Sequence, residues 1–375
     1  MKKIIIFLLI FTLFFLNTFS MAHELGNNRI ITVSMAGDVM MDGSIKRQID
    51  RNGYAYPWEK VRNYFQSSDL SIVNLETSIT TRGKKWPEKE YNFRSYPETL
   101  KPMKEAGIDV VTLANNHTLD YGFEGLMDTL NHLEKNEIAY AGGGRNKREA
   151  LMGTVIEREG VKIGIISFSR VIPDVKWYAT DKKLGLVGAY DGYTKDMMKR
   201  IEELKKEVDI VILSIHWGKE GNVEPRPEEI AVARKAIDMG ADIVMGHHPH
   251  VLQGIEVYKG KPIFYSLGNF VFGSKNDLNR TTMIGQVIIE DKKIDRIKII
   301  PCTIINGRPI PVDDEKKREK IDYIKALSSP LKTSISEDGI IEINDNIIQK
   351  KRWRCYVRAC IRRWRSQRLL SYRVL

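Results

Sequence analysis

The chain has 375 residues, of which 42% are hydrophobic and 29% charged, so it is long enough to bury a core of its own. Its formal net charge of +11 would suit a nucleic-acid-binding protein, but residues 350–375 hold ten Lys and Arg residues and no acidic residue. Subtracting these ten charges leaves about +1 for the rest of the chain, which excludes nucleic acid as an expected partner. Cys302 is the single cysteine before residue 350, so no disulfide is expected within the body of the protein.

The amino-terminal residues have the pattern of an export signal. Lys2 and Lys3 precede an apolar stretch at residues 4–19, and residues 20–22 (Ser-Met-Ala) resemble a small-x-small cleavage site. Residues 1–22 are therefore interpreted as a signal peptide that is removed or as an uncleaved amino-terminal membrane anchor. In both cases we expect the rest of the chain at the extracellular face of the cell membrane, or secreted.

Five apolar segments have the length and composition of buried strands, and helical segments alternate with them. The strand candidates are residues 29–36, 70–73, 109–114, 209–215 and 242–245. Stretches with apolar residues near a 3.6-residue period occur at residues 123–135, 194–208 and 227–239. This alternation predicts an α/β domain around a mostly parallel sheet.

Each predicted strand runs into side chains that can bind a metal ion. In chain order these are Asp38, Glu76, Asn116, His216 and the pair His248 and His250. The carboxyl ends of parallel strands form the edge at which α/β proteins bind ligands, so we expect the side chains to converge. Carboxylate, amide and imidazole groups together suit Mn, Fe or Zn better than Ca or Mg, which prefer oxygen alone. Taken singly, His216 would suit a core histidine beside Trp217, and Asn116 a turn residue.

The same motifs carry a resemblance to a known protein family. The matching pieces are residues 37–40 (Gly-Asp-Val-Met), 74–76 (Asn-Leu-Glu), 114–117 (Ala-Asn-Asn-His) with Asp120 and Gly122, 216–218 (His-Trp-Gly) with Glu220, 248–251 (His-Pro-His-Val) and 265–270 (Tyr-Ser-Leu-Gly-Asn-Phe). In order and spacing, this set resembles the capsule-synthesis protein CapA family, or poly-γ-glutamate capsule synthesis family, of the metallophosphatase-like superfamily. The resemblance extends from about residue 31 to about residue 272.

The resemblance implies a four-layer α/β/β/α sandwich with a centre for one or two divalent transition-metal ions at the strand ends. By this resemblance, Asp38 and His250 bind the first metal, Glu76 bridges, and Asn116, His216 and His248 bind the second. His117 matches the histidine that protonates the leaving group, with Asp120 orienting it. Asn269 is expected to face the substrate.

The first strand departs from the superfamily pattern. Superfamily phosphatases usually carry Asp-x-His there, whereas this chain has Asp38 followed by Met40, and a thioether is a poor ligand for a borderline cation. Asp42 is a candidate replacement ligand through a bulged turn, but an ordinary turn residue is the simpler interpretation. His247 is left out of the ligand set, because the resemblance aligns the His-x-His pair with His248 and His250.

A metal centre of this kind permits two reactions, and the sequence does not choose between them. One is in-line hydrolysis of a phosphoester, and the other is metal-assisted cleavage of an amide. Arg94 suits a clamp for an anionic substrate group, since guanidinium pairs bidentately with carboxylate or phosphate. A surface salt bridge is an equally good interpretation of Arg94.

The chain after the strand-end motifs divides into three parts. Alternating apolar residues between 281 and 304 predict a β-hairpin that closes the CapA-like metallophosphatase domain, assigned to residues 29–315. Residues 316–349 are expected to form a helical carboxy-terminal extension. The Arg- and Trp-rich tail at 350–375 suits a basic helix on an anionic membrane surface, or sequence outside the native reading frame.

Two classes of function agree with these features. The first is an exported metal-dependent hydrolase or transferase that acts on an anionic cell-envelope polymer such as a poly-γ-glutamate capsule. The second is a polymer-binding accessory subunit of a membrane capsule-synthesis complex, without turnover, alongside membrane-bound polymer-synthase subunits. His117 and Asp120 favour the enzyme, because binding alone needs no proton donor.

We predict that removal of residues 350–375 leaves the fold and the metal content unchanged. The tail lies beyond every strand-end motif and contributes no candidate ligand. Circular dichroism and elemental analysis of the truncated and full-length proteins check this expectation. An insoluble or metal-free truncated protein would show that the tail is part of the domain.

Overall fold

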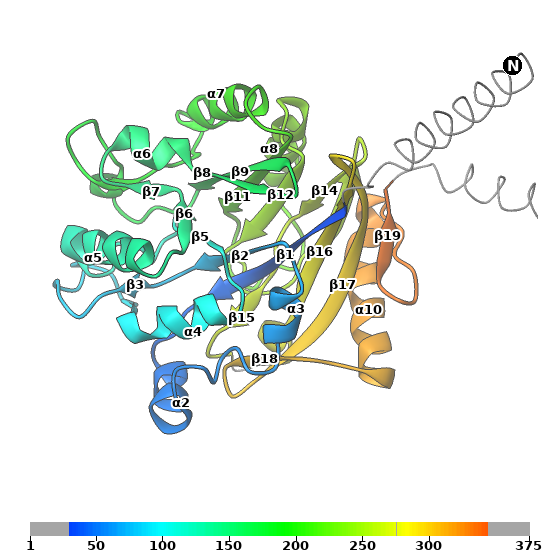
Figure 1. Cartoon of the computed structure of the whole chain (residues 1–375), viewed down its shortest axis with the longest axis horizontal. Coiled ribbons are helices and arrows are strands. Elements are labelled where there is room, and N and C mark those ends of the chain that lie inside the picture. Colours follow the sequence, from blue (N-terminus) through cyan, green and yellow to red (C-terminus); the bar gives the residue numbers. More distant parts are fainter. Residues whose placement is uncertain (1–29, 275, 344–375) are drawn as a thin grey trace, which may run out of the picture.

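The computed structural model describes residues 30–274 and 276–343. In this part of the chain, two β-sheets lie face to face and helices cover their outer faces, which gives four layers (Figure 1). The predicted export signal and the basic tail lie outside the described residues. No helix among the described residues is long and apolar enough to cross a membrane.

The first sheet contains nine strands. They are β1 (Ile30–Val39), β2 (Leu70–Leu75), β5 (Val110–Thr112), β6 (Ala139–Ala141), β15 (Asn269–Val271), β16 (Thr281–Glu290), β17 (Lys293–Ile305), β18 (Arg308–Pro311) and β19 (Ile340–Glu342). The main order is β18-β17-β16-β1-β2-β5-β6, with β15 beside β1 and β19 beside β17. Strands β1, β2, β5 and β6 run parallel, and β16 to β18 run antiparallel, so the predicted hairpin is confirmed as β16–β17.

The second sheet contains six strands. They are β8 (Thr154–Arg158), β9 (Val161–Ser169), β11 (Ile210–His216), β12 (Ile243–His247), β13 (Ile255–Tyr258) and β14 (Lys261–Phe264). The four central strands β9, β11, β12 and β14 are parallel, and the edge strands β8 and β13 are antiparallel to their neighbours. Two short pairs, β3 (Ser78–Ile79) with β4 (Arg94–Ser95) and β7 (Gly143–Gly144) with β10 (Gly185–Leu186), lie apart from both sheets.

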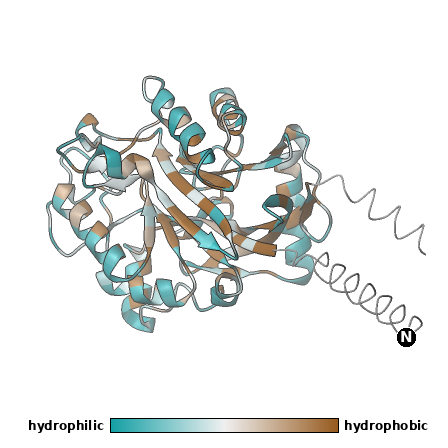
Figure 2. Ribbon diagram, turned by 45° about the horizontal axis from the view of Figure 1, so that its top comes forward, coloured by the Kyte–Doolittle hydropathy of each residue, from teal (hydrophilic) through white to brown (hydrophobic). Residues whose placement is uncertain are grey.

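Alternating side chains along the central strands fill separate cores. On β1, Ile31 and Val33 pack between the two sheets, whereas Ala36 and Val39 pack beneath the outer helices of the first sheet. Ala36 lies on the opposite face because successive side chains of a strand alternate, and the register irregularity around Asp38 brings Val39 to the same face as Ala36. Because the central strands are buried on both faces, their sequences are near-continuous apolar runs. Figure 2 shows these hydrophobic strands in the interior.

Helices of both outer layers present an apolar face to their sheet. The helices are α2 (Ser44–Asn52), α3 (Arg62–Gln66), α4 (Leu100–Glu105) and α5 (Gly122–Lys135) on the first sheet, and α6 (Lys147–Met152), α7 (Thr194–Lys205) and α8 (Pro227–Asp238) on the second. On α5, Leu126, Leu130 and Leu133 are buried at the four- and three-residue spacing that places side chains on one helical face. The sequence predicted α5, α7 and α8 from their periodicity, and the four-layer α/β/β/α sandwich with mostly parallel central strands is confirmed.

The segment after residue 315 contains more than the expected helix. Helix α10 (Asp314–Ser328) places Ile321 and Ile324 in the core between the two sheets. It is followed by η3 (Ser329–Leu331) and by β19, which pairs antiparallel with β17. The chain up to Ile343 is thus packed onto the sandwich. Shorter elements are η1 (Pro97–Thr99), η2 (Val175–Trp177) and α9 (Asp277–Arg280).

The closest approach near the strand ends occurs at Gly37, just before Asp38. A Cβ atom on Gly37 would lie 1.8 Å from the carbonyl oxygen of Gly268, which accepts a hydrogen bond of 2.9 Å from the Asp38 amide. Any larger residue must push these two backbone segments apart. The lack of a side chain at Gly37 therefore allows the Asp38 backbone to lie against Gly268.

We predict that Gly37→Ala lowers the free energy of unfolding by about 1–3 kcal/mol, the usual cost of overpacking. The matched control is Gly192→Ala, where a Cβ meets nothing within 4 Å and the expected change is within about 0.5 kcal/mol. Urea unfolding followed by circular dichroism measures both. Equal unfolding midpoints for the two variants would contradict the prediction.

Candidate metal centre

The six side chains predicted as ligands come together at the edge where the carboxyl ends of the strands of both sheets meet. Asp38 lies on β1 and His216 ends β11, while Glu76 and Asn116 follow β2 and β5. His248 and His250 lie in the loop after β12. Parallel strands bring their carboxyl ends to one edge, which is why residues far apart in sequence meet here.

One half of the site joins Asp38, Glu76 and His250. The Nδ1 atom of His250 lies 3.3 Å from Oδ2 of Asp38 and 2.9 Å from Oδ1 of Asn269, and its Nε2 lies 3.9 Å from Oε1 of Glu76. The amide of His248 approaches Oδ2 of Asp38 at 3.4 Å. Ligand atoms of Asp38, Glu76 and His250 all lie within 4.8 Å of one another, which is close enough to share one ion.

The other half joins Glu76, Asn116, His216 and His248. The Nε2 atom of His216 lies 2.8 Å from Oδ1 of Asn116 and 3.5 Å from Oε1 of Glu76. The rings of His216 and His248 have centroids 4.8 Å apart. Ligand atoms of Glu76, His216 and His248 again lie within 4.8 Å of one another. Glu76 thus belongs to both halves, the place expected of a bridging carboxylate.

The charges of the two carboxylates are strongly perturbed. Burial and the nearby carboxylate of Asp38 raise the pKa of Glu76 well above its usual range. Burial acts in the same direction on Asp38, but its contacts with His247 and His250 outweigh burial and hold the pKa of Asp38 well below its usual range. Two adjacent buried carboxylates of this kind repel each other unless a positive charge lies between them.

Two of the three candidate imidazole ligands, His216 and His248, are held in the neutral form that binds metal. Burial, aided by the neighbouring His248, lowers the pKa of His216 well below its usual range. Burial and the neighbouring His250 lower the pKa of His248 to about 3. Burial opposes a charge on His250 as well, but the hydrogen bond to Asp38 prevails and raises the pKa of His250. Metal ligation requires neutral imidazole, so His216 and His248 are prepared for it at neutral pH.

Several buried polar atoms of the site have no hydrogen-bond partner among the described residues. They include both carboxylate oxygens of Glu76 and Nδ1 of His248. An unsatisfied buried polar atom costs about 1–3 kcal/mol, and more when it is charged. A divalent cation would satisfy the oxygens of Glu76 directly, so the residues present fit a metal centre.

The loop after β12 adopts an unusual backbone to present its histidines. His248 has φ 96° and His250 has φ 58°, in a region that residues other than glycine rarely adopt. Such conformations cost about 1–3 kcal/mol each and are typical of functional sites. Here they turn two imidazoles of one short loop toward the two halves of the centre.

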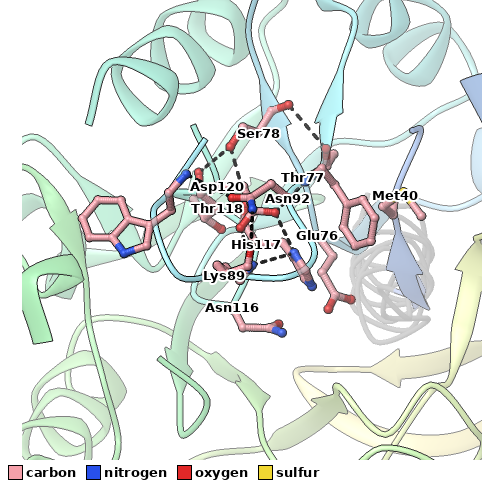
Figure 3. A network of polar contacts seen from close by, with 12 residues as sticks. Met40, Glu76, Thr77, Ser78, Lys89, Asn92, Asn116, His117, Thr118 and Asp120 are labelled. Carbon is pink, nitrogen blue, oxygen red and sulfur yellow. Dashed lines mark hydrogen bonds and ion pairs between the residues drawn. The ribbon is translucent and has the colours of Figure 1, made fainter. Parts of the chain in front are cut away.

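His117, Asp120 and Lys89 form a hydrogen-bonded group beside Glu76 and Asn116 (Figure 3). Nδ1 of His117 lies 2.7 Å from Oδ2 of Asp120, which also accepts a 2.7 Å hydrogen bond from the Phe93 amide. Lys89 Nζ donates to Oδ1 of Asp120 and lies 2.9 Å from Nδ1 of His117. Because Nδ1 of His117 faces Asp120 and Lys89, Nε2 is the ring nitrogen that remains for the site.

Arg94, Asp42 and Asn269 have structural partners that the sequence did not predict. The Arg94 guanidinium lies 4.4 Å from the centre of the Tyr121 ring, and no ion pair to Arg94 occurs within residues 30–274 and 276–343. Both oxygens of Asp42 accept backbone hydrogen bonds, from Gly43 and Arg94, as in an ordinary turn residue. Asn269 holds His250, so it orients a candidate ligand. Substrate contacts of Arg94 and Asn269 stay predictions.

Sequence reasoning missed Lys89 and His247. His247 is fully buried, with Nδ1 3.2 Å from Oδ1 of Asp38, and neither ring nitrogen makes a well-formed hydrogen bond with another described residue. His247 pairs with His216 across β12 and β11, a register that the sequence alone does not give. Lys89 lies in a loop without regular structure, and no sequence signal connects it to Asp120.

The fold and the site define an α/β sandwich protein with a candidate two-metal centre, and comparison with known proteins gives its family. The chain belongs to the bacterial capsule synthesis protein PGA_cap family, whose model matches residues 32–274. It is 32% identical to the capsule biosynthesis protein CapA of Bacillus anthracis over 334 residues, which cover 87% of this chain and 81% of the relative.

Two further relatives have related names. The PGA biosynthesis protein CapA of Bacillus subtilis (strain 168) is 32% identical over 293 residues, covering 78% of this chain and 76% of the relative. A probable polyglutamine synthesis accessory protein of Mycobacterium tuberculosis is 29% identical over 287 residues, covering 66% of this chain and 75% of the relative. The expected CapA family is therefore confirmed.

We predict that the protein purified without chelator contains near-stoichiometric Mn, Fe or Zn, and that His216→Ala loses most of it. The reason is that His216 lies against both Glu76 and Asn116 in one half of the centre. His132→Ala is the matched control, because His132 lies in the last turn of α5. Elemental analysis measures all three proteins. A wild type without metal, whose stability does not change when metal is added, would disprove the centre.

Proposed function

We propose that this protein is an exported metal-dependent hydrolase or transferase that acts on an anionic cell-envelope polymer such as poly-γ-glutamate. The observation that carries the proposal is the buried carboxylate of Glu76, which has no hydrogen-bond partner among the described residues and lies among His216, His248 and His250, next to the His117–Asp120 pair. The names of the Bacillus relatives, capsule and PGA biosynthesis proteins, support the polymer class. Location outside the cell rests on the export pattern of residues 1–22.

Asp38, Glu76 and His250 would hold one divalent ion, and Asn116, His216 and His248 would hold the other with Glu76. Ions held there would polarise a phosphoryl or acyl oxygen and lower the pKa of a water molecule. Asp38 and Asn269 fix the ring of His250 through its Nδ1, which leaves Nε2 toward Glu76. Asn269, which is not itself a candidate ligand, would thereby orient His250 from the second layer around the ion.

His117 would protonate the leaving group through Nε2. Asp120 holds the ring through Nδ1, and Lys89 and the Phe93 amide in turn hold Asp120. Burial lowers the pKa of His117 despite the opposing charge of Asp120. A lowered pKa makes the imidazolium a stronger acid, which favours transfer of its proton to a departing oxygen or nitrogen.

The alternative function is a polymer-binding accessory subunit of a membrane capsule-synthesis complex. It is favoured by Met40 in place of the expected histidine and by the accessory role in the name of the mycobacterial relative. Its partners would be the polymer and membrane-bound synthase subunits. The enzyme is the better conclusion, because a site that only binds polymer has no use for a buried Lys89–Asp120–His117 group.

We predict that His117→Ala keeps its metal but loses turnover by about 10²- to 10⁴-fold, the usual contribution of a general acid. Asn116→Ala, altered at the neighbouring residue, should instead lose metal occupancy first, because Asn116 faces His216. Metal content and hydrolysis of phosphodiester and γ-glutamyl substrates are measured for both variants. Turnover of His117→Ala at the wild-type rate would remove the proton-donor role, and a wild type that turns over none of these substrates would favour the accessory function.

A further inference from the structure

One half of the candidate metal centre is short of a ligand. The group around Asp38 consists of Asp38, Glu76 and His250, and transition-metal sites usually have four or more donors. Met40 on the same strand end does not complete it, because its Sδ atom accepts a 3.3 Å hydrogen bond from the Asp42 amide. The oxygens of Asp42 are already bonded to backbone amides.

Glu220 lies beside His250 of this half and His248 of the other half. One of its carboxylate oxygens and one ring nitrogen each of His248 and His250 all lie within 4.8 Å of one another. Glu220 is exposed, unlike the other acidic residues of the centre, and no hydrogen bond or ion pair of its side chain occurs within the described parts of the chain. Its charge also acts on both His250 and Glu76.

The turn that carries Glu220 is fastened to the histidine loop. The Gly221 amide donates a 2.8 Å hydrogen bond to the carbonyl of Pro249, between His248 and His250, and the Trp217 amide donates a 3.1 Å hydrogen bond to the carbonyl of His247. Gly218 (φ 95°) and Gly221 (φ 75°) allow the chain to reverse on either side of Glu220. The position of Glu220 relative to the two imidazoles is therefore fixed by backbone contacts.

We propose that Glu220 is a metal ligand that completes the half of the centre formed by Asp38, Glu76 and His250. Glu220 supplies the missing donor atom from the solvent side, since Met40, directly after β1, does not supply one. A carboxylate suits this role because borderline cations such as Mn accept oxygen together with imidazole. The inference rests on the proposed metal centre and adds a residue to it.

The test is a titration of chelator-treated, full-length protein with Mn²⁺, followed by calorimetry and by elemental analysis of bound metal. We expect Glu220→Ala to weaken the affinity for Mn²⁺ at one of two sites at least about tenfold. This factor is the lower end of the effect of removing the groups around metal ligands. The second site, which contains His216, should keep its affinity.

Glu224→Ala is the matched control, since Glu224 is an exposed carboxylate close to Glu220 in the same loop. It removes the same charge and should leave both sites unchanged. Repeating the titration in about 1 M salt, where the screening length is about 3 Å, separates a direct ligand from a distant charge. The Glu220→Ala loss should persist there.

Each outcome decides the proposal. Equal Mn²⁺ binding by Glu220→Ala and the wild type, equal losses in Glu220→Ala and Glu224→Ala, or a loss that vanishes in high salt would overturn the role of Glu220 and leave the metal centre standing. A wild type that binds no Mn²⁺, Fe²⁺ or Zn²⁺ would instead overturn the metal centre itself. Circular dichroism of each variant confirms that the fold is kept.

Discussion

The repulsion between two buried carboxylates, Asp38 and Glu76, is the constraint on which the rest of the site depends. Neither forms an ion pair with a lysine or arginine among the described residues, and both side chains are inaccessible to solvent. Isolated buried charges are costly, so a fold keeps such a pair only where a cation or a function compensates for it. His216 and His248, whose pKa values are lowered by burial, provide donors without adding positive charge, whereas Asp38 raises the pKa of His250.

The sandwich holds this pair by bringing two sheets into close backbone contact. The Asp38 amide bonds to Gly268, and the His248 amide approaches the Asp38 carboxylate, so strand β1 is tied to segments that follow β12 and β14. Within the second sheet, a Cβ atom at Gly246 would lie 2.0 Å from the carbonyl oxygen of Tyr265, so β12 also lies in close backbone contact with the segment after β14. Interiors packed this closely leave side chains little freedom to move, which preserves the geometry of the centre.

Much of the fold and the outline of the centre could be predicted from the sequence, because apolar strands end in Asp38, Glu76, Asn116 and His216 and parallel strands share one edge. The inward place of His247 and the partners of Lys89 could not be predicted. The directions of the adjacent His247 and His248 side chains depend on the positive φ of His248. No local sequence signal reveals such a conformation for a histidine. Lys89 reaches Asp120 from an irregular loop, and such a contact is decided by tertiary packing alone.

The candidate imidazole ligands and the candidate proton donor come from different sheets. The imidazoles come from β11 and the loop after β12 in the second sheet, whereas His117, Asp120 and Lys89 come from loops beside β5 and α5 at the first sheet. The two parts meet at the centre, where Glu76 and Asn116 contact His216. A protein that merely bound metal or polymer would need the candidate ligands but not His117, Asp120 and Lys89. Burial lowers the pKa of the Lys89 ammonium and is therefore unfavourable. A role for Lys89 in orienting His117 as a proton donor toward the candidate metal centre would explain this cost.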